Sequence, residues 1–411
     1  MDTKARTTTQ VAARRARRAV RAEARAGGRR AAWRIAALAL GLALAAGCKK
    51  KEPPQDRPVP AGSGSGSAAA AAGSAGSAPA PTPAAPTPKS GKDLAQVLLD
   101  CGELINAAKW EVFAQQCTAP GFITHQAGDR DMTGDQLIPQ LAGAKVAFPD
   151  IRVAPQLLLV NGRSVASVVL MKGTNDGPLK GEAGTLPPTK QKMGVLLYER
   201  FAMTDENKAS ERWAYVDPGT MLGQLGHRLK GAQPVRPALE QGLAGAPVIA
   251  VAADDAKEQA NLAVVKRGIE AFNGRKLADL MAGYADGIVE SDQAAGADVT
   301  GKPAIEQGLQ RLWKAFSDGK LEVPVLWAAG DYVVAEGTLT GTHDGPLAGP
   351  AGTLPKTGKR IAMSYAEIFK LEGGKVVQLW RFRNDLALMM QLGAGGPPPP
   401  PAQGTPAPPK P

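Results

Sequence analysis

Hydrophobic residues follow a helical period and then a strand period between residues 94 and 225, and the same order of periods returns later in the chain. A spacing of three and four predicts an amphipathic helix over 94–105, followed by a short helix near 110–116. The segment Thr133-Gly-Asp-Gln136 has the form of a capping box and predicts the start of a third helix. Strand-like segments then follow at 153–160, 163–171, 193–203 and 212–217, the first two joined by the hairpin signal Asn161-Gly162.

An internal repeat explains the recurrence. The stretch GTNDGPLKGEAGTLPPT at 173–189 returns as GTHDGPLAGPAGTLPKT at 341–357, with thirteen of seventeen positions identical. An offset of 167 residues also carries Trp213 to Trp380 and Gln224 to Gln391. The chain therefore contains two copies of one α+β domain, each with about three helices on one face of an antiparallel sheet. Strands of the second copy are expected at 321–328, 332–340, 360–371 and 376–383.

Composition divides the rest of the chain. The net charge is +11, but residues 1–47 hold eleven Lys/Arg against two acids, a net +9, which leaves +2 for everything after them. Because neither repeat has a basic stripe with aromatic residues between the charges, no nucleic-acid partner is expected. The expected segments are a leader at 1–47, a Pro/Ala/Gly/Ser tether at 48–93, domains at 94–227 and 255–394, a linker at 228–254 and a Pro-rich tail at 395–411.

The leader has the features of an export signal. An Arg-rich stretch precedes an apolar run at 35–46, which is too short to span a bilayer. Its end, Leu44-Ala45-Ala46-Gly47-Cys48, resembles the lipobox of bacterial lipoproteins, which implies cleavage before Cys48 and lipidation of its thiol. The expected location is the bacterial cell envelope, on the outer membrane or the periplasmic face of the inner membrane. The alternatives are an ordinary secreted protein and a cytoplasmic basic tail.

The order of the motifs resembles a known family. A Gly-Thr-x-x-Gly hairpin, a Trp near the end of the last strand and a closing Gln-Leu-Gly are similar to those of SnoaL-like polyketide cyclases, in the nuclear transport factor 2-like superfamily. The resemblance implies two tandem cone-shaped domains, each a strongly curved sheet around an apolar pocket. In this family an Asp near the end of the last strand takes a proton from the substrate, and the position seven residues before Gln224 is Asp217.

The resemblance supplies the candidate site residues. Asp217 is the candidate base, because burial in an apolar cone raises the pKa of a carboxyl group. His125 and Glu199 are the other candidate catalytic residues, since they can bind or protonate a carbonyl oxygen from the same cavity. The ligand pocket is expected to include Tyr198, Trp213, Tyr365, Glu367, Trp380, Asn384 and Asp292.

Each copy departs from the family pattern. The position matching Asp217 is Asn384, an amide that cannot act as this base, and the adjacent Asp385 is expected on the opposite face of a strand unless a bulge turns it. His125 is matched with Asp292, and the family's hairpin histidine stands only in the second copy, as His343.

Structural roles remain open alternatives for these residues. Asp217 precedes Pro218 and has the features of a helix cap. His125 and His343 are alternatively a hydrogen-bonded strand residue and a residue of the hairpin rim, and the two tryptophans, Trp213 and Trp380, are alternatively core residues.

Cysteine and histidine offer little further chemistry. Cys101 and Cys117 either form a disulfide, which export permits, or are two buried thiols. Three cysteines without a Cys-x-x-Cys pair and three scattered histidines predict no metal site, and no cofactor is expected.

Two functions follow from the sequence. We favour a lipid-anchored envelope protein that binds a small apolar ligand or a protein partner without catalysis, because the base is lost in one copy and export separates the chain from intracellular polyketide intermediates. The alternative is a cyclase or ketosteroid-isomerase-like enzyme that uses Asp217 as its base on a carbonyl substrate. The two copies are also expected to pack as an internal pseudo-dimer.

Overall fold

The computed structural model describes residues 91–128, 131–181, 184–227, 234–349 and 352–394. These residues belong to one compact unit. The predicted leader, most of the tether and the Pro-rich tail lie outside the described residues. Among the described helices, none is long and apolar enough to cross a membrane.

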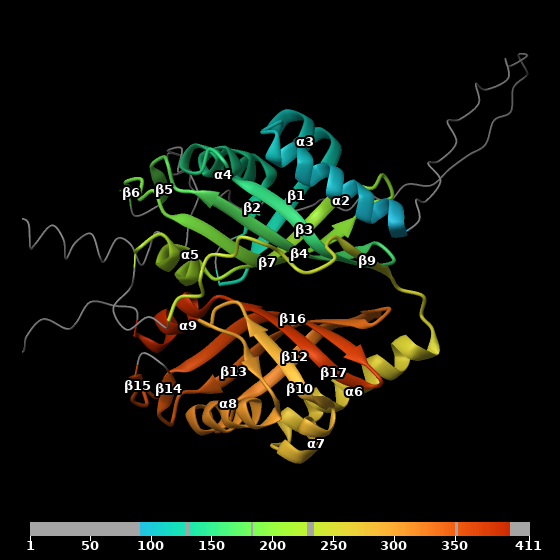
Figure 1. Ribbon diagram of the computed structural model, residues 1–411, viewed down its shortest axis with the longest axis vertical. Helices are drawn as coiled ribbons and strands as arrows, with labels where there is room; N and C mark the ends of the chain where they lie inside the picture. The colour runs from blue at the N-terminus through green and yellow to red at the C-terminus, as the bar shows by residue number, and fades with distance from the viewer. Residues whose placement is uncertain (1–90, 129–130, 182–183, 228–233, 350–351, 395–411) are drawn as a thin grey trace, which may run out of the picture. The chain divides into compact units, whose positions relative to one another are not determined.

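The first repeat is a curved sheet with helices on one face (Figure 1). Its helices are α2 (Gly91–Asn106), α3 (Trp110–Cys117), α4 (Gly134–Ala147) and α5 (Pro218–Gln224). Its sheet has the order β2-β1-β8-β7-β4-β3-β9. The strands are β1 (Thr118–Gln126), β2 (Met132–Thr133), β3 (Arg152–Asn161), β4 (Ser164–Thr174), β7 (Lys192–Met203), β8 (Ala209–Tyr215) and β9 (Val248–Val251), with β5 (Leu179–Gly181) and β6 (Gly184–Leu186) in a separate small hairpin.

The second repeat has the same plan, and its described residues contain no equivalent of β9. Its helices are α6 (Ala256–Asn273), α7 (Leu277–Ala282), α8 (Lys302–Ala315) and α9 (Asp385–Leu392). Its sheet has the order β11-β10-β17-β16-β13-β12. The strands are β10 (Tyr284–Asp292), β11 (Val299–Thr300), β12 (Lys320–Ala329), β13 (Tyr332–Thr342), β16 (Arg360–Glu372) and β17 (Lys375–Arg383), with β14 (Leu347–Gly349) and β15 (Gly352–Leu354) as the small hairpin.

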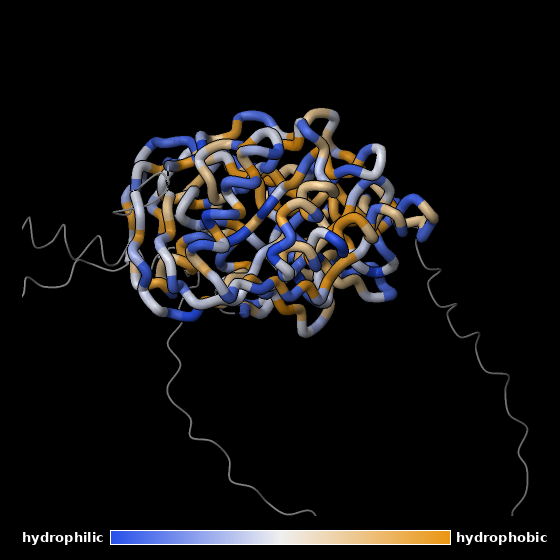
Figure 2. The backbone as a smooth tube through the Cα atoms, turned by 90° about the horizontal axis from the view of Figure 1, so that it is seen from below, coloured by the Kyte–Doolittle hydropathy of each residue, from blue (hydrophilic) through white to orange (hydrophobic). Residues whose placement is uncertain are grey.

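Local sequence signals act as predicted. The capping box at Thr133 is present, with the Gln136 side chain accepting from the Thr133 main-chain N–H at 3.0 Å. Gly162 turns the β3–β4 hairpin with a φ of 55°, a region that favours glycine. Hydrophobic and hydrophilic residues follow one another closely along the elements (Figure 2), as elements buried on one side require.

The linker and one strand pair in each sheet differ from the prediction. The segment expected as a linker, 228–254, contains a strand, because Val248–Val251 forms β9 and pairs in parallel with β3. The reason is that this short run is rich in β-branched residues and adds to the edge strand of the first sheet. The sheets are also not purely antiparallel, because β1 pairs in parallel with β8, and β10 with β17.

The two faces of each sheet serve different cores. We call the face covered by helices the inner face and the opposite one the outer face. Each inner face packs with its own helices, around Leu158 in the first repeat and Ile288 in the second. The outer faces of both sheets contribute to one further core, in which Tyr198 of β7 lies 5.8 Å from Phe382 of β17 between ring centroids. This shared core joins the repeats.

A polar cluster lies within that shared core. Glu336 of β13 accepts hydrogen bonds from the Tyr198 hydroxyl at 2.7 Å and from Arg200 Nε at 2.5 Å. Arg200 also stacks over Trp213, with its guanidinium carbon 3.7 Å from the ring centroid. Only 5% of the Glu336 side chain and 12% of the Arg200 side chain are exposed, so a charged pair is buried where the repeats meet.

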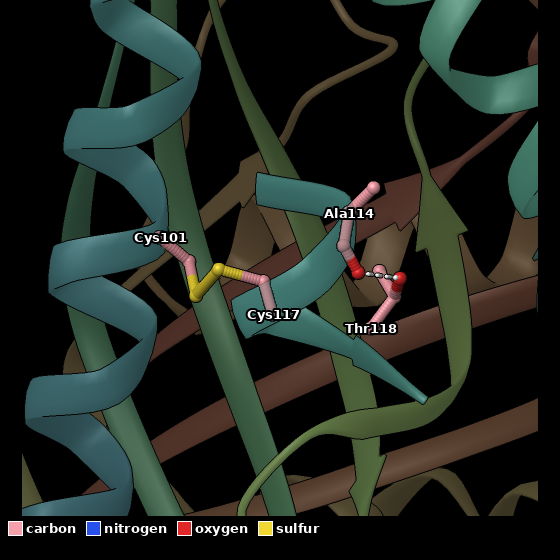
Figure 3. Close-up of a disulfide and its surroundings, with 4 residues drawn as sticks. All are labelled: Cys101, Ala114, Cys117 and Thr118. Carbon is pink, nitrogen blue, oxygen red and sulfur yellow. Dashed lines mark hydrogen bonds between the residues drawn. A yellow bond between two sulfur atoms is a disulfide. The ribbon is translucent and has the colours of Figure 1, made fainter. Parts of the chain in front are cut away.

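The disulfide left open by the sequence is present. Cys101 of α2 is bonded to Cys117 at the end of α3 (Figure 3). The corresponding positions in the second repeat are Gly268 of α6 and Gly283, which follows α7. The bridge thus places two sulfur atoms inside the first repeat where the second has only hydrogen atoms as side chains.

Candidate ligand cavity

The second repeat encloses a cavity of about 400 Å³ between its helices and the inner face of its sheet. Gly268 and Gly283 are part of its wall. Its apolar lining includes Val265, Ile269, Phe272, Ile305, Leu309, Phe316, Leu339, Ile361, Phe369 and Leu388. A concave, mostly apolar space of this size is typical of a small-molecule site.

Four acids and two of the three lining arginines form ion-paired groups in the cavity. Arg381 Nη1 lies 2.6 Å from Glu290, and its Nε lies 2.7 Å from Glu367. These three residues form one ion-paired group on adjacent strands β10, β17 and β16.

The second group contains Arg383. This arginine lies 2.9 Å from Asp292 and 2.5 Å from Asp385. These six residues line the cavity, and Arg311 is a further charged residue of the lining. Four carboxyl groups and three guanidinium groups therefore line the cavity, so acids outnumber arginines by one.

Burial raises the pKa of two of the acids that line the cavity. Removal from water raises the pKa of Glu367, against the opposing effect of Arg381. Burial likewise raises the pKa of Asp385, and the nearby Asp292 acts in the same direction. These two carboxyl groups therefore hold their protons to higher pH than exposed acids do.

Only part of the predicted pocket lines this cavity. Tyr365, Glu367 and Asp292 do. Trp213 and Trp380 instead pack against the outer-face core that joins the repeats, in agreement with their alternative role. Asn384 is the N-cap of α9, where its Oδ1 accepts from the Ala387 main-chain N–H at 2.9 Å.

The sequence prediction missed Glu290, Arg381, Arg383 and Asp385. The signal was present, because charges at every second residue of an otherwise apolar strand place them all on one face. The expectation that Asp385 points away from this face was wrong. That expectation assumed that Asn384 faces the pocket, whereas Asn384 is the N-cap of α9 and Asp385 lies with Arg383, two residues before it.

The structure shows Asp217 as a helix cap. Its Oδ2 accepts from the Thr220 main-chain N–H at 2.7 Å and from the Thr220 hydroxyl at 2.8 Å. Its Oδ1 accepts from the main-chain N–H of Asp385, in the second repeat, at 3.0 Å. The residues that line the cavity do not include Asp217, and both of its oxygens already accept hydrogen bonds. The candidate base therefore begins α5 and contacts the second repeat.

His125, Glu199 and Tyr198 do not converge with Asp217 on one cavity. The His125 ring stacks on Trp213, at 5.1 Å between centroids, and its nitrogens lie 2.9 Å from Asp131 and 3.3 Å from Glu211. Glu199 accepts from Arg212 Nε at 2.7 Å on the inner face. Tyr198 donates to Glu336 in the outer-face core, one residue away on the same strand and therefore on the other face of the sheet.

The number of residues between corresponding positions of the two repeats changes along the chain. This change explains why the predicted site residues do not lie on one face. Strand pairing places His125 opposite Trp213 and Ser291 opposite Trp380, so His125 corresponds to Ser291 and not to Asp292. In the same way Glu199 corresponds to Glu367 at an offset of 168, and Tyr198 to Ala366. The signal lay in the hairpin blocks, which are 168 residues apart while the tryptophans are 167 apart. One residue of offset exchanges the faces of a strand.

His343 and Asn175 brace the repeated hairpin. His343 Nδ1 accepts from the Thr357 main-chain N–H at 3.2 Å, and Asn175 Oδ1 accepts from that of Thr189 at 2.8 Å. His343 is fully buried against Phe316, at 5.3 Å between ring centroids. This explains why the block recurs so closely, because each end of it binds the other. Within the described residues, no three His, Cys, Asp or Glu side chains are grouped as a metal site.

Comparison with known proteins agrees with this fold. The sequence model of the family described as SnoaL-like polyketide cyclase matches residues 95–225 and 263–392. Similar solved structures include AclR from Streptomyces galilaeus, 26% identical over 33% of this chain and 97% of that one, with a TM-score of 0.30. A SnoaL-like polyketide cyclase from Jannaschia sp. CCS1 is 24% identical over 35% and 97% of the two chains, with a TM-score of 0.32. TsrD from Streptomyces laurentii is 24% identical over 34% and 99%, with a TM-score of 0.31. No curated protein matches the chain.

Proposed function

Because the chain belongs to the SnoaL-like polyketide cyclase family through both of its repeats, we propose that its function resides in the cone of the second repeat. This cone binds an apolar small molecule that carries hydroxyl or amine donors, and it does so without chemistry. The observation that supports the proposal is the cavity of about 400 Å³, with apolar walls and an excess of carboxyl groups. Such a site stabilises a ligand by burial of its apolar part and fixes it by hydrogen bonds to the acids.

Two contacts argue for binding rather than catalysis. The family's base position is occupied by a cap in the first repeat, Asp217, and by an amide in the second, Asn384. Each carboxyl group that pairs with Arg381 or Arg383 already has a charged partner, which leaves it less free to act on a substrate.

Proton transfer by Asp385 is the second candidate function. Its carboxyl group lines the cavity, and burial raises its pKa, which are the two properties that a base of this family needs. This candidate replaces the predicted role of Asp217. If Asp385 is the base, Asp385→Asn abolishes turnover of a carbonyl substrate and leaves binding of an unreactive apolar probe intact.

Filling the cavity tests the binding proposal. A Cβ built on Gly268 meets no atom within 4 Å, so the Gly268→Phe side chain enters the cavity without a clash at its base. We expect this variant to weaken binding of the fluorescent probe N-phenyl-1-naphthylamine at least about tenfold, because the ring occupies ligand space. A fluorescence titration measures the change.

Gly287→Phe is the matched control. Gly287 also has open space around a built Cβ, but it does not line the cavity. It should bind the probe like the unchanged chain. Equal binding by the Gly268→Phe variant would contradict the proposal.

We also propose that the chain is anchored to the bacterial cell envelope through lipid on Cys48. The support is the apolar run before Cys48 and the small residues at its end. Acyl chains on one residue give stable anchoring when there are two or more of them. The Pro-rich tether then separates the repeats from the membrane surface.

Metabolic labelling tests the anchor. In cells fed an alkyne analogue of palmitate, the unchanged chain should carry the label and sediment with membranes. Cys48→Ala should remove the label and release the chain from the membrane fraction. A labelled or fully membrane-bound Cys48→Ala variant would refute the anchor.

A further inference from the structure

The linker between the repeats contacts the cavity of the second repeat. Pro234 is part of the cavity lining, together with the loop residues Ala294, Ala295 and Gly296. The contact is close, because a Cβ on Gly296 would lie 2.8 Å from the Pro234 carbonyl oxygen. A segment outside the family match thus forms part of the wall.

Arg236 fastens the linker to this loop by three contacts. Its Nη2 donates to the Asp292 carbonyl oxygen at 2.9 Å, and its Nε donates to the Ala295 carbonyl oxygen at 3.1 Å. Its Nη1 lies 2.8 Å from the Asp298 carboxylate. Only 10% of its side chain is exposed. A buried guanidinium with donors in a fixed fork holds a loop more precisely than one hydrogen bond does.

The other side of the linker is held by the first repeat. Gln224 Nε2 of α5 donates to the Arg236 carbonyl oxygen at 3.0 Å. The Leu239 main-chain N–H donates to the Gly194 carbonyl oxygen of β7 at 2.9 Å. Residues 236–239 of the linker therefore bind to both repeats.

The same loop carries one of the cavity acids. Asp292, whose carbonyl oxygen accepts from Arg236, pairs through its carboxylate with Arg383 inside the cavity. In the first repeat, Asp217 accepts from the Asp385 main-chain N–H, and the Thr220 hydroxyl, shared with Asp217, lies 3.3 Å from the Gln293 carbonyl oxygen. Asp292 and Asp385 are the two acids that pair with Arg383. The main chain at both of them is thus held by residues from outside the second repeat.

We propose that the ligand site of the second repeat is a composite site. The linker supplies part of its wall through Pro234, and Arg236 is the positioning residue that holds the loop 292–298 against it. This inference rests on the proposed function, since it concerns the same cavity. It assigns the first repeat and the linker the task of completing the site in the second.

Two readouts on the full chain test the composite site. The first is the affinity for N-phenyl-1-naphthylamine. The second needs no ligand: Met363, which lines the cavity, is changed to Cys, and the rate of its modification by methyl methanethiosulfonate is measured. For this readout Cys48 is changed to Ser, and Cys101 and Cys117 are already joined.

Arg236→Ala should raise the modification rate about tenfold or more and weaken probe binding by a similar factor, at a temperature where every variant is folded. Arg236→Lys should fall close to Arg236→Ala, because a single ammonium group cannot reproduce the fork. Arg163→Ala, which removes contacts to Asn207 and Asp205 in the first repeat, is the matched control and should change neither readout.

An unchanged modification rate in Arg236→Ala overturns the composite site. If Arg236→Ala speeds the modification at position 363 but the chain does not bind the probe even with Arg236 present, the composite site is supported and the proposed function is contradicted. The failure of one proposal can therefore be told from the failure of the other.

Discussion

Replacing Glu336 by alanine is expected to lower the free energy of unfolding by about 3–5 kcal/mol, because it leaves the buried Arg200 guanidinium without its partner. Arg200 and the Tyr198 hydroxyl both donate to Glu336 in the outer-face core that joins the repeats. Its corresponding residue in the first repeat is Val168, so the first repeat has no equivalent acid to replace it. Urea denaturation followed by tryptophan fluorescence measures the loss.

An exposed ion pair supplies the control for this prediction. Glu240 lies 2.8 Å from Lys192 with both side chains well exposed, so Glu240→Ala should lower the free energy of unfolding far less than Glu336→Ala does. A double variant, Glu336→Leu with Arg200→Met, should regain much of the stability, because it leaves no buried charge. A loss in Glu336→Ala no larger than that in Glu240→Ala would show that the cluster does not join the repeats.

Asp217 is expected to make the stability of the chain depend on pH. Burial, with the nearby Asp385, raises its pKa from 3.8 to about 6. The folded chain therefore holds this proton more tightly than the unfolded chain, and the stabilisation is complete below the unfolded pKa and is lost as the pH rises through about 6. At about 1.4 kcal/mol per pKa unit, the loss attributable to this group approaches about 3 kcal/mol.

Asp217→Asn isolates this contribution. The amide caps a helix about as well as the carboxylate and does not titrate, as Asn384 shows at the corresponding position. The stability advantage of the unchanged chain over this variant should therefore decline between about pH 4 and about pH 7. Glu367 is not among the groups that shift the pKa of Asp217, so it cancels in the difference, whereas Asp385 enters the difference through its interaction with Asp217. Urea denaturation at several pH values measures it, and a difference that is constant with pH would mean that Asp217 is not a buried, titrating cap.

Much of the fold follows from local chemistry in the sequence. The repeated hairpin block, the Asn161-Gly162 turn and the capping box at Thr133 each specify their own geometry, so the tandem α+β plan was predictable. The edge strand β9 was not, because its four residues are a strand only where β3 offers a free edge. A proline-rich stretch gives no sign of that edge.

The site residues were less predictable from the sequence than the fold. A change of one residue in the offset between the repeats moves a side chain to the other face of its strand. Tyr365, Glu367 and Asp292 were predicted from the family resemblance, although Asp292 was matched with His125, which corresponds to Ser291. The predicted base, Asp217, is a cap, and the role follows from the Asp-Pro sequence alone. The contribution of Arg236 depends on contacts between segments about 60 residues apart, which no local pattern records.

We propose that the second repeat, and not the first, holds the ligand. A crystal structure of the full chain grown with N-phenyl-1-naphthylamine distinguishes the two repeats. The probe is expected inside the second cone, in contact with Gly268 and the wall near Pro234, with the disulfide in place in the first repeat. A probe bound within the first repeat or on an outer surface, with the second cone unoccupied, would contradict it.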